Sequence, residues 1–279
     1  MQSLPYDKSE VEALIRASLP REDGLQRTVI RAMREAVENG GKRIRPILLF
    51  ESCKCFAEAR SESGWKEEAA PFLAALEMIH SFSLVHDDLP CMDNDILRRG
   101  KPTTWYVYGE AMGTLAGDGL VLEALTLAGK AVAASKHAER AARALAILGE
   151  KSGVFGMLGG QSVDVEKTGE SLDAATLDFI YRLKTGALLE AAFMMGAALG
   201  GATEEELRLA EQIGAAVGLA FQIRDDILDE TASEAELGKP LHSDEKNQKT
   251  TYVSLYGLES AKEAVRQQSE IAAQRLKDF

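Results

Sequence analysis

The stretch AAPFLAALEMIHSFSLV, residues 69–85, decides the fold class. Its apolar side chains recur at spacings of three and four residues, which is the period of one face of an α-helix. A second stretch, residues 207–227, has the same spacing. The apolar positions are Phe72, Leu73, Leu76, Met78, Ile79, Phe82 and Val85 in the first stretch, and Leu207, Ala210, Ile213, Val217, Ala220, Ile223 and Ile227 in the second. The pattern predicts two long helices.

Signals for β-strands are nearly missing elsewhere. Aromatic residues make up only 6% of the chain, and apolar and polar residues do not alternate over any sustained run bounded by turns. No repeat with a period of roughly 20 to 50 residues is present. The helical pattern is interrupted at 39–41, 61–64, 90, 100–102, 169 and 231–244. Because none of these breaks is long enough to be a clear domain linker, the sequence predicts one all-α domain over residues 1–279.

The charge of the chain restricts its ligands. Its 279 residues include 32 Lys and Arg against 44 Asp and Glu, which gives a formal net charge of −12. Such an acidic chain has no general affinity for nucleic acid or for anionic membrane surfaces. An anionic ligand must therefore be bound by a local group of basic residues.

The lack of recognisable targeting signals and the small number of cysteines predict a cytoplasmic protein. Residues 191–202 are the most apolar later stretch, and they are far shorter than the roughly 18 residues of a membrane span. The N-terminal residues lack a basic stretch followed by an apolar run, so they do not form a signal peptide. Three cysteines are too few for a disulfide scaffold and lack the second pair of a structural zinc site. We expect no stable membrane association.

An acidic cluster lies at the C-terminal end of the second apolar stretch. On a helix, Asp225 and Asp226 lie about 40° and 60° from Asp229, on opposite sides of it, so the three carboxylates converge on one patch. Ligand sets made only of oxygen favour Mg²⁺ over zinc. A solvated acidic helix end is the alternative, but the neighbouring Phe221 and Ile227 are apolar, and buried carboxylates need partners.

A matching cluster follows the first apolar stretch. It contains Asp87, Asp88 and Asp93, and Pro90 should end the helix so that the later acid folds back toward the first pair. Mg²⁺ is typically held by one or two carboxylates together with substrate phosphates. Two such patches therefore suggest a phosphate-rich ligand.

Two basic groups complement the acidic clusters. In GGKRIRP, residues 40–46, Lys42 and Arg45 lie near a predicted helix start, where unpaired backbone N–H groups favour anions. Arg98 and Arg99 follow the first acidic cluster, although a surface charge run remains an alternative for this pair. His80, seven residues before Asp87, shares the aspartate face of the helix; alone, it would be an ordinary core histidine.

Other common active-site types lack their motifs. The chain contains no GxxxxGK[ST] phosphate loop, no GxSxG nucleophile elbow and no HExxH zinc motif. The sequence therefore argues against these three types of active site.

Taken together, these motifs resemble those of the short-chain trans-isoprenyl diphosphate synthases, and within that family the bacterial farnesyl diphosphate synthases (geranyltranstransferases). The matching segments, which occur in the order of the family, are GGKRIRP (40–46), HSFSLVHDDLPCMDNDILRRGKPT (80–103), GGQSVD (159–164), KTGALLEAA (184–192), FQIRDDILD (221–229), LGKPLHSD (237–244) and KTTY (249–252).

The resemblance implies a single large helical bundle around a deep apolar cavity, the isoprenoid synthase fold, with the two aspartate motifs facing each other at its mouth. It also implies a homodimer and Mg²⁺ as cofactor, with three ions when substrate is bound. The main metal ligands would be Asp87, Asp93 and Asp225, with Asp88, Asp226 and Asp229 in supporting roles.

The same resemblance assigns the substrate contacts. Isopentenyl diphosphate would be held by Lys42, Arg45, His80 and Arg99. The allylic diphosphate would be held by Arg98, Lys184, Thr185, Gln222 and Lys239. The expected catalytic residues are Lys184, Thr185, Gln222, Asp87 and Asp225.

The reaction implied is condensation of isopentenyl diphosphate with geranyl or dimethylallyl diphosphate. Residues one helical turn before Asp87 should lie beneath the diphosphate and form the floor of the cavity. Phe82 and Ser83 occupy this turn, and an aromatic residue there favours farnesyl diphosphate as product; Phe82 could instead belong to the ordinary core. Alternatives are geranylgeranyl or geranyl diphosphate synthesis, terpene cyclisation, and a non-catalytic helical subunit.

Overall fold

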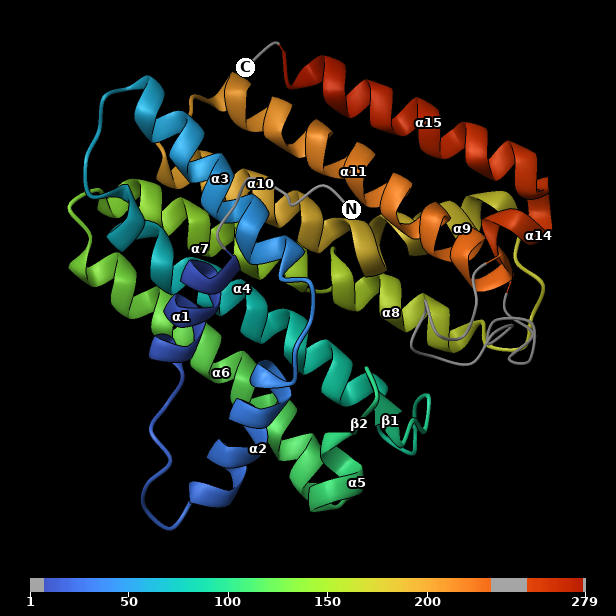
Figure 1. The fold of residues 1–279 in the computed structure, drawn as a ribbon, viewed down its shortest axis with the longest axis horizontal. Helices are drawn as coiled ribbons and strands as arrows, with labels where there is room; N and C mark the ends of the chain where they lie inside the picture. Colours follow the sequence, from blue (N-terminus) through green and yellow to red (C-terminus); the bar gives the residue numbers. More distant parts are fainter. Residues whose placement is uncertain (1–7, 232–249, 278–279) are drawn as a thin grey trace. The chain divides into compact units, whose positions relative to one another are not determined.

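The computed structural model describes residues 8–231 and 250–277. These residues, which Figure 1 draws as a coloured ribbon, divide into two compact units. The N-terminal unit comprises residues 1–146 and 195–201, and the C-terminal unit comprises residues 147–194 and 202–279. Two of the three boundaries between the units fall inside helices, α7 (Ala138–Ser152) and α10 (Ala187–Leu199), and the third, after residue 201, follows the end of α10.

Helices dominate the N-terminal unit, which also has one short hairpin. Its complete elements are α1 (Lys8–Ser18), α2 (Arg27–Glu38), α3 (Ile44–Ala59), α4 (Trp65–Asp87), β1 (Leu97–Arg98), β2 (Lys101–Pro102), α5 (Thr104–Tyr108) and α6 (Glu110–Ala134). The two strands are antiparallel, with Leu97 opposite Pro102 and Arg98 opposite Lys101. Gly100 has a φ of 73°, in the left-handed region that a tight turn requires.

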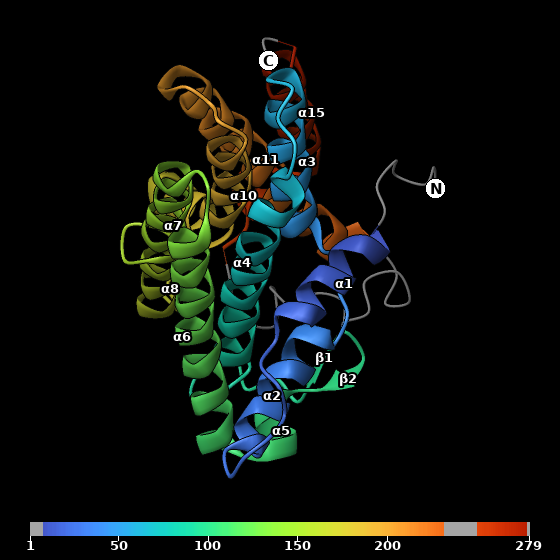
Figure 2. The same ribbon diagram turned by 90° about the vertical axis from the view of Figure 1, so that its left-hand side faces the viewer.

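Helix α4 forms the core of the N-terminal unit. Phe72, Leu73 and Leu76 are fully buried and belong to a continuous buried run over residues 72–79, whereas most of residues 80–87 are partly buried. Helix α6 runs alongside α4, and α3 and α1 also pack against it (Figures 1 and 2). Because α4 is apolar on nearly all sides, it is covered on nearly all sides. The acidic cluster that begins at Asp87 therefore starts where a rigid, buried helix ends.

Helices α4 and α6 both have the length and hydropathy of a membrane span. We expected no apolar stretch of that length. By length and composition, this expectation is wrong. In α4, 61% of the most apolar window is buried, as in the core helix of a soluble protein. In α6 only 33% of that window is buried, so this helix has an open apolar face.

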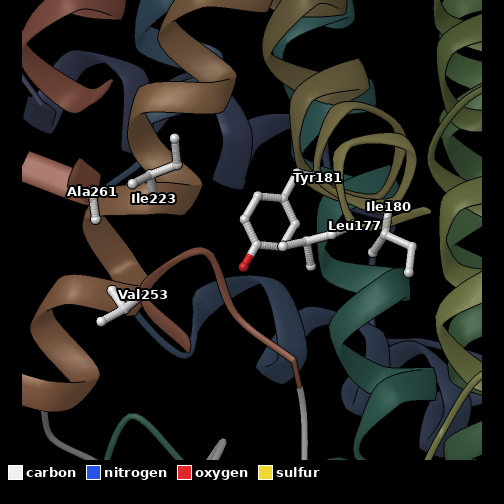
Figure 3. Close-up of a cluster of buried hydrophobic side chains, with 6 residues drawn as sticks. All are labelled: Leu177, Ile180, Tyr181, Ile223, Val253 and Ala261. Atoms are coloured by element: carbon white, nitrogen blue, oxygen red, sulfur yellow. The ribbon is translucent and has the colours of Figure 1, made fainter. Parts of the chain in front are cut away.

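The C-terminal unit is also helical. Its complete elements are α8 (Met157–Glu166), α9 (Ala174–Ile180), the π-helix η1 (Tyr181–Gly186), α11 (Glu204–Thr231), α14 (Tyr252–Tyr256) and α15 (Leu258–Arg275). Helices α11 and α15 run side by side (Figure 1). A cluster of buried apolar side chains joins η1, α9, α11, α14 and α15 around Tyr181, Ile223 and Val253 (Figure 3). This cluster supports the end of α11 that carries Asp225.

Most predictions about the fold are confirmed. The two apolar stretches lie inside α4 and α11, and the predicted break at 39–41 separates α2 from α3. Helix α4 ends at Asp87, three residues before Pro90, as expected. The all-α class is correct, although sequence reasoning did not find the small hairpin. The prediction of one domain over the whole chain remains a prediction.

Candidate functional site

The basic turn of the N-terminal unit is shaped by two glycines and an arginine. Gly40 and Gly41 have φ angles of 96° and 123°, which other residues rarely adopt. The Arg99 guanidinium donates a hydrogen bond of 2.6 Å to the Gly40 carbonyl. A Cβ atom at Gly41 would lie 2.6 Å from Nη1 of Arg99. The two glycines therefore permit Arg99 to approach the turn that carries Lys42, which is exposed.

Arg43 anchors the same turn to α4. Its side chain is buried, donates 2.6 Å to Glu77 of α4 and donates 2.7 Å to the carbonyl of Val37. Its φ of 53° is left-handed, a conformation that costs energy in a residue with a side chain. The buried ion pair holds the backbone in this conformation. Sequence reasoning assigned no role to Arg43 or Glu77.

Three of the predicted isopentenyl diphosphate ligands gather beside this turn. Nη1 of Arg45 lies 3.5 Å from Nε2 of His80, and Nε of Arg45 is buried with no hydrogen-bond partner among the described residues. Burial, together with the charge of Arg99, lowers the pKa of Arg45 to about 10. Burial and then the neighbouring arginines lower the pKa of His80 well below its usual value, so His80 is neutral at pH 7. The group has the charge and the available donor that an anion would satisfy.

The first acidic cluster folds back as predicted. The backbone N–H of Asp93 donates 2.8 Å to the carbonyl of Asp87. Asp87 is partly buried and Asp93 is exposed, whereas Asp88 is buried. Asp88, Arg98 and Arg99 line one pocket together with residues at the end of α2 and on α4.

Asp88 is paired with an arginine that we expected to contact substrate. Nε and Nη2 of Arg98, on β1, lie 2.7 and 2.6 Å from one oxygen of Asp88. Burial raises the pKa of Asp88 to about 6, even though the hydrogen bond from Arg98 opposes the rise. This carboxylate is thus already occupied by a protein partner.

The predicted floor residues lie on α4 below Asp87. The Phe82 ring packs edge-on against His86, with 5.7 Å between the ring centres. Ser83 donates 2.9 Å to the carbonyl of His80. A Cβ atom at Gly117 of α6 would overlap the His86 ring, so this glycine permits the close approach of α6 to α4.

The C-terminal unit contains a polar pocket between α8, η1, α11 and residues 250–251. Lys184 donates 2.6 Å to Asp164 of α8. A Cβ atom at Gly160 would overlap the backbone nitrogen of Lys184, so α8 packs directly against η1. π-Helical segments frequently mark functional sites. Sequence reasoning assigned roles to Lys184 and Thr185 but not to Asp164, although the matching segment 159–164 contained it.

A chain of hydrogen bonds crosses this pocket. The Thr185 hydroxyl donates 2.7 Å to Oε1 of Gln222, and Nε2 of Gln222 donates 3.3 Å to Asp226. The other oxygen of Asp226 accepts from the Tyr181 hydroxyl at 2.5 Å and from the Tyr252 N–H at 2.9 Å. Sequence reasoning missed Tyr181 and Tyr252.

The second acidic cluster differs from the expected convergent patch. Asp225 is exposed, whereas Asp226 and Asp229 are buried. Within residues 8–231 and 250–277, no group of three or more His, Cys, Asp or Glu side chains could hold a metal ion unaided. Asp93 in the N-terminal unit and Asp225 in the C-terminal unit are both exposed. Lys239 and Lys249 lie outside the described residues.

Comparisons with known proteins identify the family. Residues 26–278 match polyprenyl synthetase. The chain belongs to the polyprenyl synthetase family. It is therefore a prenyltransferase of isoprenoid biosynthesis.

Individual relatives agree with this assignment. Farnesyl diphosphate synthase from Geobacillus stearothermophilus is 40% identical over 99% of this chain and 91% of its own length. Chloroplastic geranylgeranyl pyrophosphate synthase from Capsicum annuum is 44% identical over 89% of this chain and 66% of its own. The solved geranyltransferase of Helicobacter pylori, complexed with magnesium and isoprenyl diphosphate, has a TM-score of 0.83 and is 32% identical, covering 99% of this chain and 93% of that one. This likeness confirms the isoprenoid synthase fold.

Proposed function

We propose that this polyprenyl synthetase is a Mg²⁺-dependent farnesyl diphosphate synthase. It condenses isopentenyl diphosphate with geranyl diphosphate, and also with dimethylallyl diphosphate, and releases diphosphate. The observation that carries the proposal is the group formed by Arg45, His80 and Arg99, in which a buried guanidinium N–H has no partner among the described residues. Burial lowers the pKa of both Arg45 and Arg99, and Arg99 lowers that of Arg45 further, so a diphosphate beside these two cations would stabilise their charged forms.

The candidate site residues take different parts in the reaction. Lys42, Arg45, His80 and Arg99 bind isopentenyl diphosphate, and Ser83 and Phe82 lie under the allylic chain. Asp87, Asp93 and Asp225 would hold the Mg²⁺ ions, three when substrate is bound, and Asp88, Asp226 and Asp229 would support them. The allylic diphosphate is bound by Arg98, Lys184, Thr185, Gln222 and Lys239.

The chemistry proceeds by ionisation, condensation and elimination. Bound Mg²⁺ supplies positive charge that stabilises the diphosphate leaving group. Lys184 adds its ammonium charge to that leaving group, and its position is fixed by Asp164. Oxygens of Thr185 and Gln222 stabilise the allylic cation, which the double bond of isopentenyl diphosphate attacks. The released diphosphate then accepts the proton that is lost.

Chain length is the finer part of the proposal. The Phe82 ring is held edge-on against His86, one helical turn before the acidic cluster, which supports a short cavity and a C15 product. Geranylgeranyl diphosphate synthesis is the alternative, because the Capsicum annuum relative that carries this activity in its name is 44% identical. If Phe82 forms the floor of the cavity, Phe82→Ala should yield some product longer than C15. Unchanged C15 output from Phe82→Ala would place the floor elsewhere.

The activity is tested with radiolabelled isopentenyl diphosphate and each allylic primer, followed by sizing of the acid-labile products. Arg45→Gln should raise the KM for isopentenyl diphosphate about 100-fold, because a charged hydrogen-bond partner is lost in a desolvated site, while the KM for geranyl diphosphate stays nearly constant. Absence of product with every primer would contradict the proposal. Equal rises in both KM values would contradict the assignment of Arg45.

We also propose a cytoplasmic homodimer. On α6, the large apolar residues Leu115, Leu122 and Leu125 are 54%, 65% and 40% exposed and lie seven and three positions apart, on one face of the helix. Cys53, Cys55 and Cys91 are free thiols, which suits a reducing compartment. Sedimentation should show a dimer, and Leu122→Glu should convert it to monomer. A wild-type monomer would refute the dimer.

A further inference from the structure

Tyr181 begins the π-helix and lies among apolar side chains of the C-terminal unit (Figure 3). Only 7% of the residue is exposed. Its hydroxyl donates 2.5 Å to Oδ2 of Asp226. The backbone N–H of Tyr252 is shared between that same carboxylate oxygen, at 2.9 Å, and the Tyr181 hydroxyl, at 3.2 Å. One phenol thus connects η1, α11 and the start of α14.

The carboxylate of Asp226 determines which way Gln222 faces. A carboxylate only accepts hydrogen bonds, so the amide nitrogen of Gln222 must face Asp226 and its oxygen must face Thr185. The Thr185 hydroxyl then donates to that oxygen, and its lone pairs are left for other contacts. The orientation of both side chains therefore depends on where Asp226 is held.

The hydrogen bonds of Tyr181 and Asp226 also hold residues 250–252 at one wall of the pocket. The pocket is lined by Tyr181, Gln222 and Asp226, and also by Thr250 and Thr251. The Thr250 hydroxyl accepts a hydrogen bond of 3.0 Å from the backbone N–H of Leu172, which is also in the lining. Asp226 and Tyr181 fix the next residue along the chain, Tyr252, through its N–H.

We propose that Tyr181 is a positioning residue of this pocket. By donating to Asp226, it fixes the orientation of Gln222 and Thr185 and holds residues 250–252 against the pocket. The inference rests on the proposed function, because it assigns Tyr181 to the allylic side of the reaction. A buried carboxylate needs several donors, and a neutral phenol supplies one without adding positive charge beside the substrate cation.

The first experiment compares kinetics of Tyr181→Phe and Tyr256→Phe. Tyr181→Phe removes the hydroxyl and keeps the ring in the apolar cluster, whereas Tyr256 is exposed and serves as the matched control. Tyr181→Phe should lower kcat with geranyl diphosphate about tenfold, the effect of one hydrogen bond to a charged group. The KM for isopentenyl diphosphate should stay unchanged, since that substrate is assigned to other residues. Wild-type kcat in Tyr181→Phe, or a loss that Tyr256→Phe reproduces, would overturn the proposal.

A double-mutant cycle tests whether Tyr181 acts through Asp226. If it does, the variant with both Tyr181→Phe and Asp226→Asn should be no slower than Asp226→Asn alone, because the interaction is already lost. Multiplicative losses of kcat would show that Tyr181 acts independently of Asp226, and the proposal would fail.

Hydrogen exchange of the Tyr252 amide tests the same interaction without any substrate. That amide should exchange about tenfold faster in Tyr181→Phe than in wild type, whereas Tyr256→Phe should leave it protected. Unchanged protection in Tyr181→Phe would overturn the positioning role. This readout keeps the inference separate from the proposed function, which fails instead if the wild-type protein forms no prenyl product.

Discussion

The two acidic pairs, Asp87–Asp88 and Asp225–Asp226, have the same arrangement but are held in different ways. In each pair the first aspartate is the more exposed and the second is buried. Asp88 is held by the guanidinium of Arg98, whereas Asp226 is held by the neutral phenol of Tyr181 and a backbone N–H. The two motifs look alike in sequence, but their buried carboxylates are stabilised by different kinds of hydrogen-bond donor.

The surroundings of the two pairs extend this difference. In the N-terminal unit, charged groups are buried close to other charges: burial and then Arg99 lower the pKa of Arg45 to about 10, and burial raises the pKa of Asp88 to about 6 against the opposing effect of Arg98. Around Asp226, hydroxyl, amide and backbone groups complete a hydrogen-bond chain. Stability in the first region should depend on charge, and stability in the second on close packing and hydrogen-bond geometry.

The largest effect on stability should come from the buried ion pair beside the basic turn. Both Arg43 and Glu77 are almost fully buried, at 6% and 3% exposure. Arg43→Met should lower the free energy of unfolding by about 4 kcal/mol, because it leaves the Glu77 charge in the interior. Urea denaturation measures the loss. The double variant with Glu77→Met should recover most of it, and a double variant as unstable as Arg43→Met would contradict the reason given.

Alanine substitutions at Gly117 in the N-terminal unit and Gly160 in the C-terminal unit test how tightly helices pack in each unit. A Cβ atom at Gly160 would overlap the backbone of η1, whereas one at Gly117 would overlap only the His86 side chain. Gly160→Ala should cost about 3 kcal/mol of unfolding free energy and Gly117→Ala about 1 kcal/mol, because a side chain can move and a packed backbone cannot. Thermal and urea unfolding of both variants measures the two losses. Equal losses would show that the regions tolerate added volume alike.

Loss of the partner of Asp88 should have a smaller effect than loss of Arg43. Arg98→Gln should cost about 1–2 kcal/mol at pH 7, because its side chain is partly exposed and Asp88 can take up a proton when the guanidinium is gone. Lys101→Gln is the matched control, since Lys101 is exposed and lies opposite Arg98 in the register of the hairpin. A loss as large as that of Arg43→Met would show that Asp88 stays charged.

The sequence predicted two long helices and the breaks that follow them, and it found the charged residues that form motifs; the predicted break at 231–244 lies outside the described residues except for residue 231. Periodicity sufficed for α4 and α11 because each is long and apolar, and Gly40 with Gly41 marked a turn. The partners of these residues were not predictable. Tyr181 and Asp226 are 45 positions apart, and Arg43 and Glu77 are 34 apart. No local pattern records such pairings, because tertiary packing alone creates them.

The smallest effect that we expect is a pH dependence confined to the first region. In the folded protein, burial and the charges of Arg45, Arg99, Arg98 and Arg43 lower the pKa of His80 below that of the unfolded chain. Below about pH 6.5 the unfolded chain binds the extra proton and the folded protein does not, so His80 destabilises the fold as the pH falls through that value.

His80→Gln removes this titration, so the difference in unfolding free energy between variant and wild type should increase in favour of the variant from pH 7.5 to pH 5.5. Urea denaturation at both pH values measures this difference. Because the wild-type value is subtracted from the variant value at each pH, the titration of groups that the two proteins share cancels. Because Arg45 is the largest charge acting on His80, the increase should shrink in an Arg45→Gln background. An increase of the same size in that background would mean that burial, the largest cause of the lowered pKa of His80, keeps it neutral without help from Arg45, and charge would then matter less in the first region than its composition suggests.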